Sequence, residues 1–185
     1  MTDGEGLDVE IVPLRRRHLP GVLRIERQVY PTPWSMSLFL QELGLDHRVY
    51  RAARRPGHGE VLGYAGVIVV GDEGHVATVA VHPGWQRHAI GSRLLLDVTR
   101  GAIVEGATAM TLEVRSSNRA AQAMYARFGY APAGIRKGYY PSGVRSGRPE
   151  DAVIMWTEDI TTDEYAARLQ LIEAGLPGTT VWSAA

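Results

Sequence analysis

A strand, a helix and a second strand follow one another in the middle of the chain, and this unit constrains the fold most. Residues 75–81 and 109–114 are short, apolar and bounded by turn residues, as buried strands are. Between them, residues 90–102 carry apolar side chains along one stripe at helical spacing, and the helix is expected to end near Gly106. Because such a crossover joins parallel strands, the sequence predicts an α/β fold with a parallel strand pair.

The flanking segments add antiparallel strands and further helices. The expected strands are short apolar runs separated by turn residues: 9–14, 47–53, 61–70, and a final hairpin of 131–139 and 151–156 around the loop 141–150. The expected helices have apolar residues at helical spacing: 18–30, 36–43 with Ser35 as N-cap, the helix that Asn118 caps and Gly129 ends, and 162–174. The sum is one mixed, mostly antiparallel sheet with one parallel strand pair, flanked by helices, and a frayed Pro/Gly tail.

Composition excludes several classes of protein. The 20 Lys and Arg balance the 20 Asp and Glu, so no overall field attracts nucleic acid or an anionic membrane. The chain has no cysteine, which excludes disulfides, thiolate metal sites and a covalent cysteine intermediate. No apolar run is long enough to span a membrane, and the acidic N-terminal segment lacks the pattern of a secretory signal. We therefore expect a cytoplasmic protein without a nucleic-acid or membrane partner.

The segment VAVHPGWQRHAIGSRLL, residues 79–95, passes from a strand through a turn into a helix that begins at a glycine. The first turn of a helix offers unpaired N–H groups and a partial positive charge, which suit a pyrophosphate group. Gln86 and Arg87 can add side-chain donors. An ordinary strand-to-helix turn has the same pattern, so the residues alone leave both interpretations open. His82 and His88 flank the turn without further ligands at usable spacing, and no metal site is expected.

This segment resembles the acetyl-CoA loop of the GNAT acetyltransferase family, Q/R-x-x-G-x-G/A after a strand. Here the loop stands as Gln86-Arg87-His88-Ala89-Ile90-Gly91, with Ala89 in place of the first glycine. Three further segments are similar to the RimI group of that family: VYPTPWS (29–35), LEVRSSNRAAQAMYARFGY (112–130) and KGYYPSG (137–143). The four motifs stand in the family's order and cover roughly residues 9–156. The resemblance implies a flexible N-terminus over 1–8, a GNAT acyl-CoA N-acyltransferase domain over 9–158, and a C-terminal helix and tail over 159–185.

The resemblance also implies acetyl-CoA as the co-substrate. In this family the pantetheine arm pairs with the strand before the loop, the loop backbone holds the pyrophosphate, and the Asn118 amide meets the pantetheine. Asn118 is equally well explained as a plain N-cap, and one amide can serve both purposes. The implied acetyl-CoA-binding residues are Val79, Ala80, Val81, Gln86, Arg87, His88, Ala89, Ile90, Gly91, Ser92 and Asn118. The Cβ of Ala89 costs about 1 kcal/mol if its position needs a positive φ.

Two residues stand where the RimI group has its catalytic pair. The resemblance makes Glu113 the general base, acting directly or through a water, and Tyr125 the acid that protonates the departing CoA thiolate. The residues themselves allow other interpretations. Glu113 can pair with Arg115 on the same face of its strand, and Tyr125 shares the apolar stripe of its helix and can be a core aromatic residue.

By the same resemblance, Trp34, Tyr139 and Tyr140 contact the acceptor peptide, and the two tyrosines otherwise pack the end of the sheet. The implied activity is acetylation of a protein's N-terminal α-amine, an alanine on a ribosomal small-subunit protein, by direct attack in a ternary complex. Two alternatives remain: an acetyltransferase of lysine or a small amine, and a CoA-binding regulator without catalysis. A monomer or weak dimer is expected.

Overall fold

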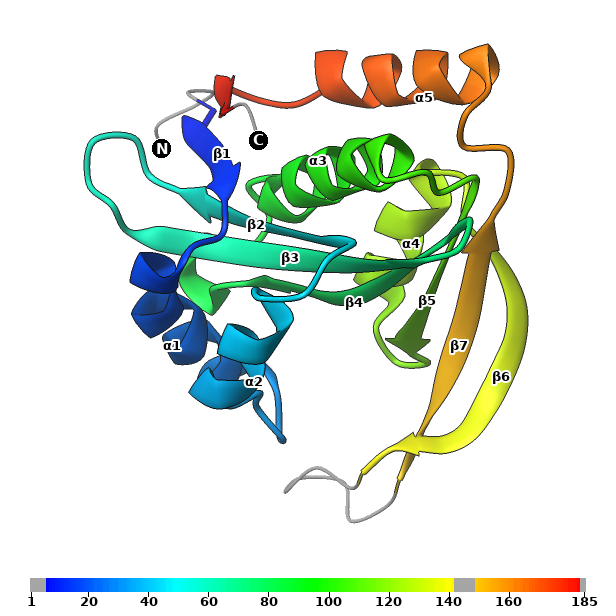
Figure 1. Cartoon of the computed structure of the whole chain (residues 1–185), viewed down its shortest axis with the longest axis horizontal. Coiled ribbons are helices and arrows are strands. Elements are labelled where there is room, and N and C mark those ends of the chain that lie inside the picture. The colour runs from blue at the N-terminus through cyan, green and yellow to red at the C-terminus, as the bar shows by residue number, and fades with distance from the viewer. Residues whose placement is uncertain (1–5, 142–148, 184–185) are drawn as a thin grey trace.

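The computed structural model describes residues 6–141 and 149–183, which form one mixed sheet of eight strands with helices on both faces (Figure 1). The strand order is β6-β7-β5-β4-β3-β2-β1-β8. In chain order the strands are β1 (Val9–Pro13), β2 (Arg48–Arg54), β3 (Val61–Val70), β4 (Glu73–Val81), β5 (Ala109–Arg115), β6 (Ala131–Tyr140), β7 (Glu150–Thr157) and β8 (Thr180–Trp182). The mixed, mostly antiparallel sheet of the sequence prediction is confirmed.

Five α-helices flank the sheet within the described residues: α1 (Leu19–Val29), α2 (Met36–Glu42), α3 (Ile90–Val104), α4 (Arg119–Arg127) and α5 (Asp163–Ala174). Figure 1 shows α1 and α2 on one face and α3 and α4 on the other. Both predicted N-caps form, since Ser35 Oγ accepts from the Leu38 amide at 3.2 Å and Asn118 Oδ1 accepts from the Ala121 amide at 3.1 Å. No helix in the described part of the chain is long and apolar enough to cross a membrane.

The predicted parallel pair consists of β4 and β5, and it is short. The two strands pair over Glu73–Ala109, Gly74–Met110 and His75–Thr111 only. Beyond these residues β4 continues to Val81 paired with β3, and β5 continues to Arg115 paired with β7. The facing edges of β4 and β5 are therefore separate over the rest of their length, and a groove opens between them in the middle of the sheet.

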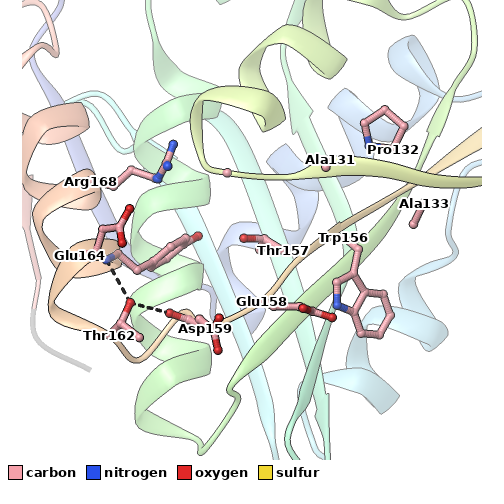
Figure 2. A pocket seen from close by; sticks show the side chains of 12 residues that line it. Ala131, Pro132, Ala133, Trp156, Thr157, Glu158, Asp159, Thr162, Glu164 and Arg168 are labelled. Atoms are coloured by element: carbon pink, nitrogen blue, oxygen red, sulfur yellow. Dashed lines mark hydrogen bonds between the residues drawn. The ribbon is translucent and has the colours of Figure 1, made fainter.

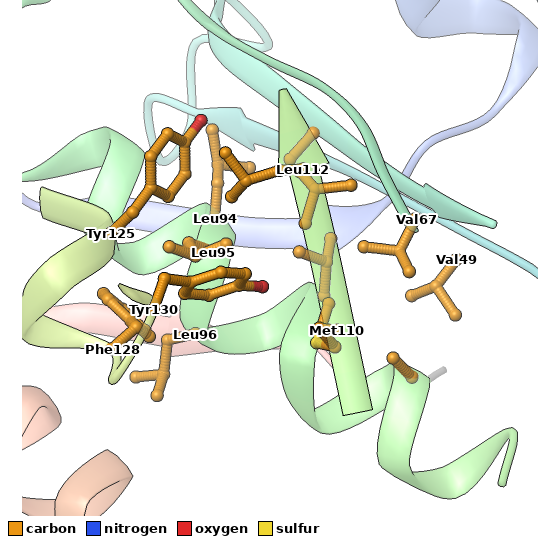
Figure 3. Close-up of a cluster of buried hydrophobic side chains, with 14 of the residues drawn as sticks. Val49, Val67, Leu94, Leu95, Leu96, Met110, Leu112, Tyr125, Phe128 and Tyr130 are labelled. Atoms are coloured by element: carbon orange, nitrogen blue, oxygen red, sulfur yellow. The ribbon is translucent and has the colours of Figure 1, made fainter. Parts of the chain in front are cut away.

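Each face of the sheet carries its own hydrophobic core. The larger cluster lies under α3, α4 and α5, and Figure 3 shows part of it, with Leu94, Leu95 and Leu96 of α3 among the labelled side chains. The smaller cluster lies under α1 and α2 and includes Phe39 and Tyr64. The two layers hold both edges of the groove, so its shape is set by packed secondary structure.

The C-terminal tail differs from the prediction. Thr180–Trp182 forms β8, which pairs parallel with β1 and makes a second parallel pair, so the expectations of a frayed tail and of one parallel pair were wrong. The strand has three residues after a Pro/Gly stretch, too few for a periodic signal. It forms because β1 offers an open edge: Val9 N donates to Thr179 O at 3.0 Å and Ser183 N donates to Ile11 O at 2.9 Å.

The N-terminal segment is held by this tail. Leu7 packs against the larger core, and Asp8 Oδ1 accepts from the Thr179 amide at 3.1 Å. The flexibility expected for residues 1–8 stays a prediction, and residues 1–5 lie outside the described part. The predicted hairpin of β6 and β7 is present, and residues 142–148 of its connecting loop also lie outside the described residues.

Candidate active site

A groove of about 1180 Å³ lies where β4 and β5 separate. Its walls come from β4, β5, the N-terminal turn of α3, one face of α4, the segment after α1 and the end of β6. All the site residues predicted from the sequence line this groove except His88. The His88 ring instead lies edge-on to Trp85, and its Nδ1 is 2.9 Å from the Gln86 carbonyl.

The loop before α3 has an unusual backbone. Arg87 and Ala89 adopt left-handed conformations, with φ of 68° and 57°, and Ala89 is the N-cap of α3 without a side-chain cap bond. Gly91 is closely packed, because an added Cβ would lie 3.2 Å from Met124 Sδ. Ile90, Gly91 and Ser92 of this first helical turn line the groove. The unpaired amides at a helix start suit an anion.

Glu113 lies on β5 at the floor of the groove, with 9% of its side chain exposed. Arg136 Nη2 is 3.1 Å from one carboxylate oxygen, and His75 Nε2 is 3.4 Å from the other. Arg115 makes a different pair, with Glu150 at 2.9 Å, and its guanidinium lies 4.2 Å from the centre of the Tyr140 ring. The alternative in which Glu113 pairs with Arg115 is therefore wrong.

Tyr125 lies both in the larger hydrophobic core and at the groove. Its ring packs in the larger core, 5.8 Å from the Tyr130 ring centre, and Figure 3 shows it at the margin of that cluster. The same side chain lines the groove. Burial, with smaller effects from Tyr30 and Tyr140, raises the pKa of the Tyr125 hydroxyl well above its usual value. The hydroxyl therefore keeps its proton at neutral pH.

The residues predicted to contact the acceptor lie at the other end of the groove: Trp34, Tyr139 and Tyr140. The Tyr140 hydroxyl donates to the Glu113 carbonyl at 3.0 Å, and burial raises the pKa of Tyr140 to about 12. The Tyr139 ring lies edge-on to it at 5.1 Å. Trp34 borders the groove from the α1 side and packs on Phe39 at 5.2 Å. The groove thus joins an anion-binding loop, a buried carboxylate, a buried phenol and an aromatic rim.

The model of the acetyltransferase (GNAT) family matches residues 19–130. The chain belongs to the GNAT family. Members of this family use acetyl-CoA, and a GNAT relative has been solved with it bound.

Similar GNAT proteins cover most of the chain. The ribosomal protein bS18-alanine N-acetyltransferase of Escherichia coli K12 is 34% identical over 145 residues, 78% of this chain and 94% of that protein. N-alpha-acetyltransferase RimI of Mycobacterium tuberculosis H37Rv is 36% identical over 70% of this chain and 82% of its own. The crystal structure of the ribosomal-protein-S18-alanine N-acetyltransferase from Escherichia coli superposes with a TM-score of 0.72 at 31% identity, covering 82% of this chain and 94% of that one.

The GNAT groove contains an acid that the sequence analysis missed. Glu26 of α1 is 1% exposed, and its carboxylate accepts from the Trp34 amide at 2.7 Å and from the Tyr64 hydroxyl. Burial raises its pKa from 4.5 to about 7, although the Trp34 hydrogen bond opposes the rise. The signal was available, since Glu26 follows Ile25 on the apolar stripe of Leu19 and Val22, where a carboxylate is unexpected.

Three more residues that line the GNAT groove or contact Glu113 were not predicted, and two of them, His75 and Arg136, come from strands whose patterns carry no sign of a site. His75 and Arg136 contact Glu113 from β4 and β6. Tyr30 donates its hydroxyl hydrogen to the Val79 carbonyl at 3.0 Å. This bond holds the end of α1 against β4.

A second hollow lies away from the GNAT groove, between the ends of β6 and β7 and the start of α5 (Figure 2). It measures about 460 Å³, and Glu158, Glu164 and Arg168 border it. Thr162 caps α5 there, since its Oγ1 accepts from the Tyr165 amide at 3.2 Å and donates to the Asp159 carbonyl at 2.8 Å. None of the predicted site residues lines this hollow.

Replacing Ala89 by Gly is expected to raise the melting temperature by about 2–4 °C. A left-handed Ala costs about 1–2 kcal/mol, which exceeds the roughly 0.4–1 kcal/mol that Gly adds to the entropy of the unfolded chain. Differential scanning fluorimetry measures the shift. Ala123→Gly is the matched control, because Ala123 is exposed within α4 and its φ is not positive, and it should lower the melting temperature. A lower value for Ala89→Gly would show that the Ala89 methyl group makes stabilising contacts.

Proposed function

We propose that this protein transfers the acetyl group of acetyl-CoA to the α-amine of a protein N-terminus that begins with alanine, with the N-terminus of a ribosomal small-subunit protein as its first candidate. The observation that carries this proposal is the single groove that contains the anion-binding loop, Glu113, Tyr125 and the aromatic rim. The relatives named for bS18-alanine acetylation support the choice of acceptor.

Acetyl-CoA fits the open side of β4. Beyond His75 this strand has no β5 partner, so Val79 to Val81 can pair with an extended pantetheine arm as with an added strand. The amides from Arg87 to Ser92 hold the pyrophosphate at the start of α3. Asn118 lines the same groove, and its Oδ1 already caps α4, so its amide nitrogen remains as the donor for the pantetheine.

The reaction is a direct transfer. The neutral amine attacks the thioester carbonyl, Glu113 takes a proton from the amine directly or through one water, and Tyr125 gives its proton to the departing sulfur. The chain has no cysteine to carry an acyl intermediate, so both substrates are bound together when the acetyl group moves.

The chemistry of the amine favours an N-terminus over lysine. An α-amine has a pKa near 8, whereas that of lysine is about 10.4, so far more of the α-amine is neutral and nucleophilic at pH 7.4. A single carboxylate base suffices for the first amine and is a poor base for the second. We place the acceptor's first residues beneath Tyr139 and Tyr140 and beside Trp34, in a cytoplasmic monomer or weak dimer.

Two peptides of matched sequence test the acceptor. One begins with a free Ala and has its lysine replaced by glutamine, and the other has an acetylated N-terminus and a free lysine. Mass spectrometry should show transfer to the first at least about tenfold faster, as the difference in neutral fraction requires. Equal rates would make the protein an acetyltransferase of lysine or small amines. Binding of acetyl-CoA without transfer to either peptide would favour a regulator.

A further inference from the structure

Arg93 is a charged side chain buried inside the fold. It belongs to the first turn of α3, is 0% exposed, and is the largest fully buried side chain among the described residues. Its Nε donates to Thr180 Oγ1 at 2.7 Å, its Nη1 donates to the His88 carbonyl at 2.7 Å, and its Nη2 donates to the Pro177 carbonyl. These three acceptors are neutral, so none offsets the charge of the guanidinium.

These hydrogen bonds connect two distant parts of the chain. His88 lies between the left-handed residues Arg87 and Ala89, so its carbonyl marks the middle of the acetyl-CoA loop. Pro177 and Thr180 belong to the tail, and the tail is held in turn by the pairing of β8 with β1. Arg93 therefore ties the loop to the far edge of the sheet.

The positive charge of Arg93 is balanced only in part by its surroundings. Burial lowers the pKa of its guanidinium, and the field of Asp8 opposes this only in part, yet an arginine keeps its proton in a protein. A buried cation is costly unless an anion lies near it. Ile90, Gly91 and Ser92 of the same helical turn line the groove, whereas Arg93 does not, so Arg93 can act on a ligand there only through the loop that it holds.

We propose that Arg93 and the tail strand β8 together clamp the pyrophosphate loop in its binding conformation, which makes Arg93 a positioning residue for acetyl-CoA. The inference rests on the proposed placement of the pyrophosphate at this loop. The family match covers residues 19–130, so β8 lies outside the matched segment. The tail thus serves the cofactor without touching it.

The clamp has a reciprocal consequence. If the tail stabilises the binding conformation of the loop, then a ligand at the loop stabilises the tail by the same factor. Acetyl-CoA should therefore slow hydrogen exchange of the amides that join β8 to β1, among them those of Val9 and Ser183. A tail with only a general role in stability would not respond to the ligand in this specific way.

Conservative substitutions in β8 test the clamp. Thr180→Val removes the hydroxyl that accepts from Arg93 Nε and keeps a side chain of similar size. Thr180→Ser keeps the hydroxyl. Val181→Thr changes the exposed neighbouring residue and is the control. Calorimetry and steady-state kinetics should show Thr180→Val raising the Kd and KM for acetyl-CoA about fivefold, with kcat and the peptide KM unchanged. Thr180→Ser and Val181→Thr should match the wild type. Arg93→Met should show a larger loss.

Hydrogen exchange completes the test. Acetyl-CoA should protect residues 176–183 in the wild type and in Thr180→Ser, and should protect them less in Thr180→Val. An equal loss of kcat and of peptide affinity in Thr180→Val would make β8 a general stability element and overturn the clamp. If Arg93→Met does not fold, Thr180→Val decides alone.

The variant Gly91→Asp separates this inference from the proposed function, because it adds a carboxylate to the first turn of α3, where the pyrophosphate is proposed to bind. If Gly91→Asp binds acetyl-CoA as the wild type does, the loop placement is wrong and the clamp falls with it. If Gly91→Asp loses binding while Thr180→Val and a folded Arg93→Met bind normally, the loop placement stands and the clamp alone is wrong.

Discussion

Replacing Glu113 by Gln is expected to lower kcat about 100-fold or more, since general acid–base groups contribute about 10²–10⁴-fold. Gln keeps the size of the side chain and can still accept hydrogen bonds from Arg136 and His75, but it cannot take a proton from the amine. The Kd for acetyl-CoA should stay within about twofold of the wild type, because no reaction is needed for binding. Stopped assays with a free Ala peptide and calorimetry measure the two quantities.

Tyr125→Phe should have an effect of similar size, because it removes the proton donor and leaves the packing of the ring unchanged. Tyr130→Phe is the matched control. Its ring lies 5.8 Å from that of Tyr125, its hydroxyl is buried without a hydrogen-bond partner among the described residues, and it does not line the groove. It should turn over at the wild-type rate. Near wild-type rates in both Glu113→Gln and Tyr125→Phe would show that these residues have only structural roles. Parallel lines in double-reciprocal plots of rate against substrate concentration would contradict direct transfer.

The second large effect is on stability and its pH dependence. The unfolding free energy of the wild type, relative to that of Glu26→Gln, is expected to fall by about 3 kcal/mol as pH rises from 4.5 to about 7. Below this range the carboxyl is protonated in both the folded and the unfolded chain. Within it, the folded protein retains a proton that the unfolded chain releases. Above it, the folded state holds a buried carboxylate, and the stabilisation is lost.

Urea denaturation of both proteins at several pH values measures this difference. Glu10→Gln is a control of opposite sign, since the Arg54 hydrogen bond lowers the pKa of Glu10 and its stabilisation is lost as pH falls below 4.5. Stability curves for the wild type and Glu26→Gln that run parallel between pH 4.5 and 7 would show that Glu26 has an ordinary pKa. The Trp34 amide would then be held by a carboxylate that is charged throughout.

Much of the fold could be predicted because its signals are local. The N-caps Ser35 and Asn118, the apolar stripe of α3 and the short apolar β5 each depend on a few neighbouring residues, and each forms as expected. β8 could not be predicted, because three residues after a Pro/Gly stretch become a strand only when the edge of β1 is available to pair with them.

The parts of the site that could be predicted are those that belong to sequence motifs. The motifs bring Glu113, Tyr125 and the loop to one groove, and their roles there remain proposals. Contacts between side chains escaped prediction. His88 turns away from the groove toward Trp85, and the partners of Glu113 come from β4 and β6, which are distant in sequence. No spacing rule relates such residues, since they meet only after the sheet has formed.

The pairing of β8 with β1 joins the strand that is synthesised first to the strand that is synthesised last. β1 precedes every other strand of the sheet in the chain, and β8 follows them all. The ribosome therefore synthesises all the other strands between the two members of this pair. Until the tail emerges, β1 presents an open edge and Arg93 lacks two of its three acceptors. All the residues that line the groove therefore precede β8, the strand that the proposed clamp of the loop requires.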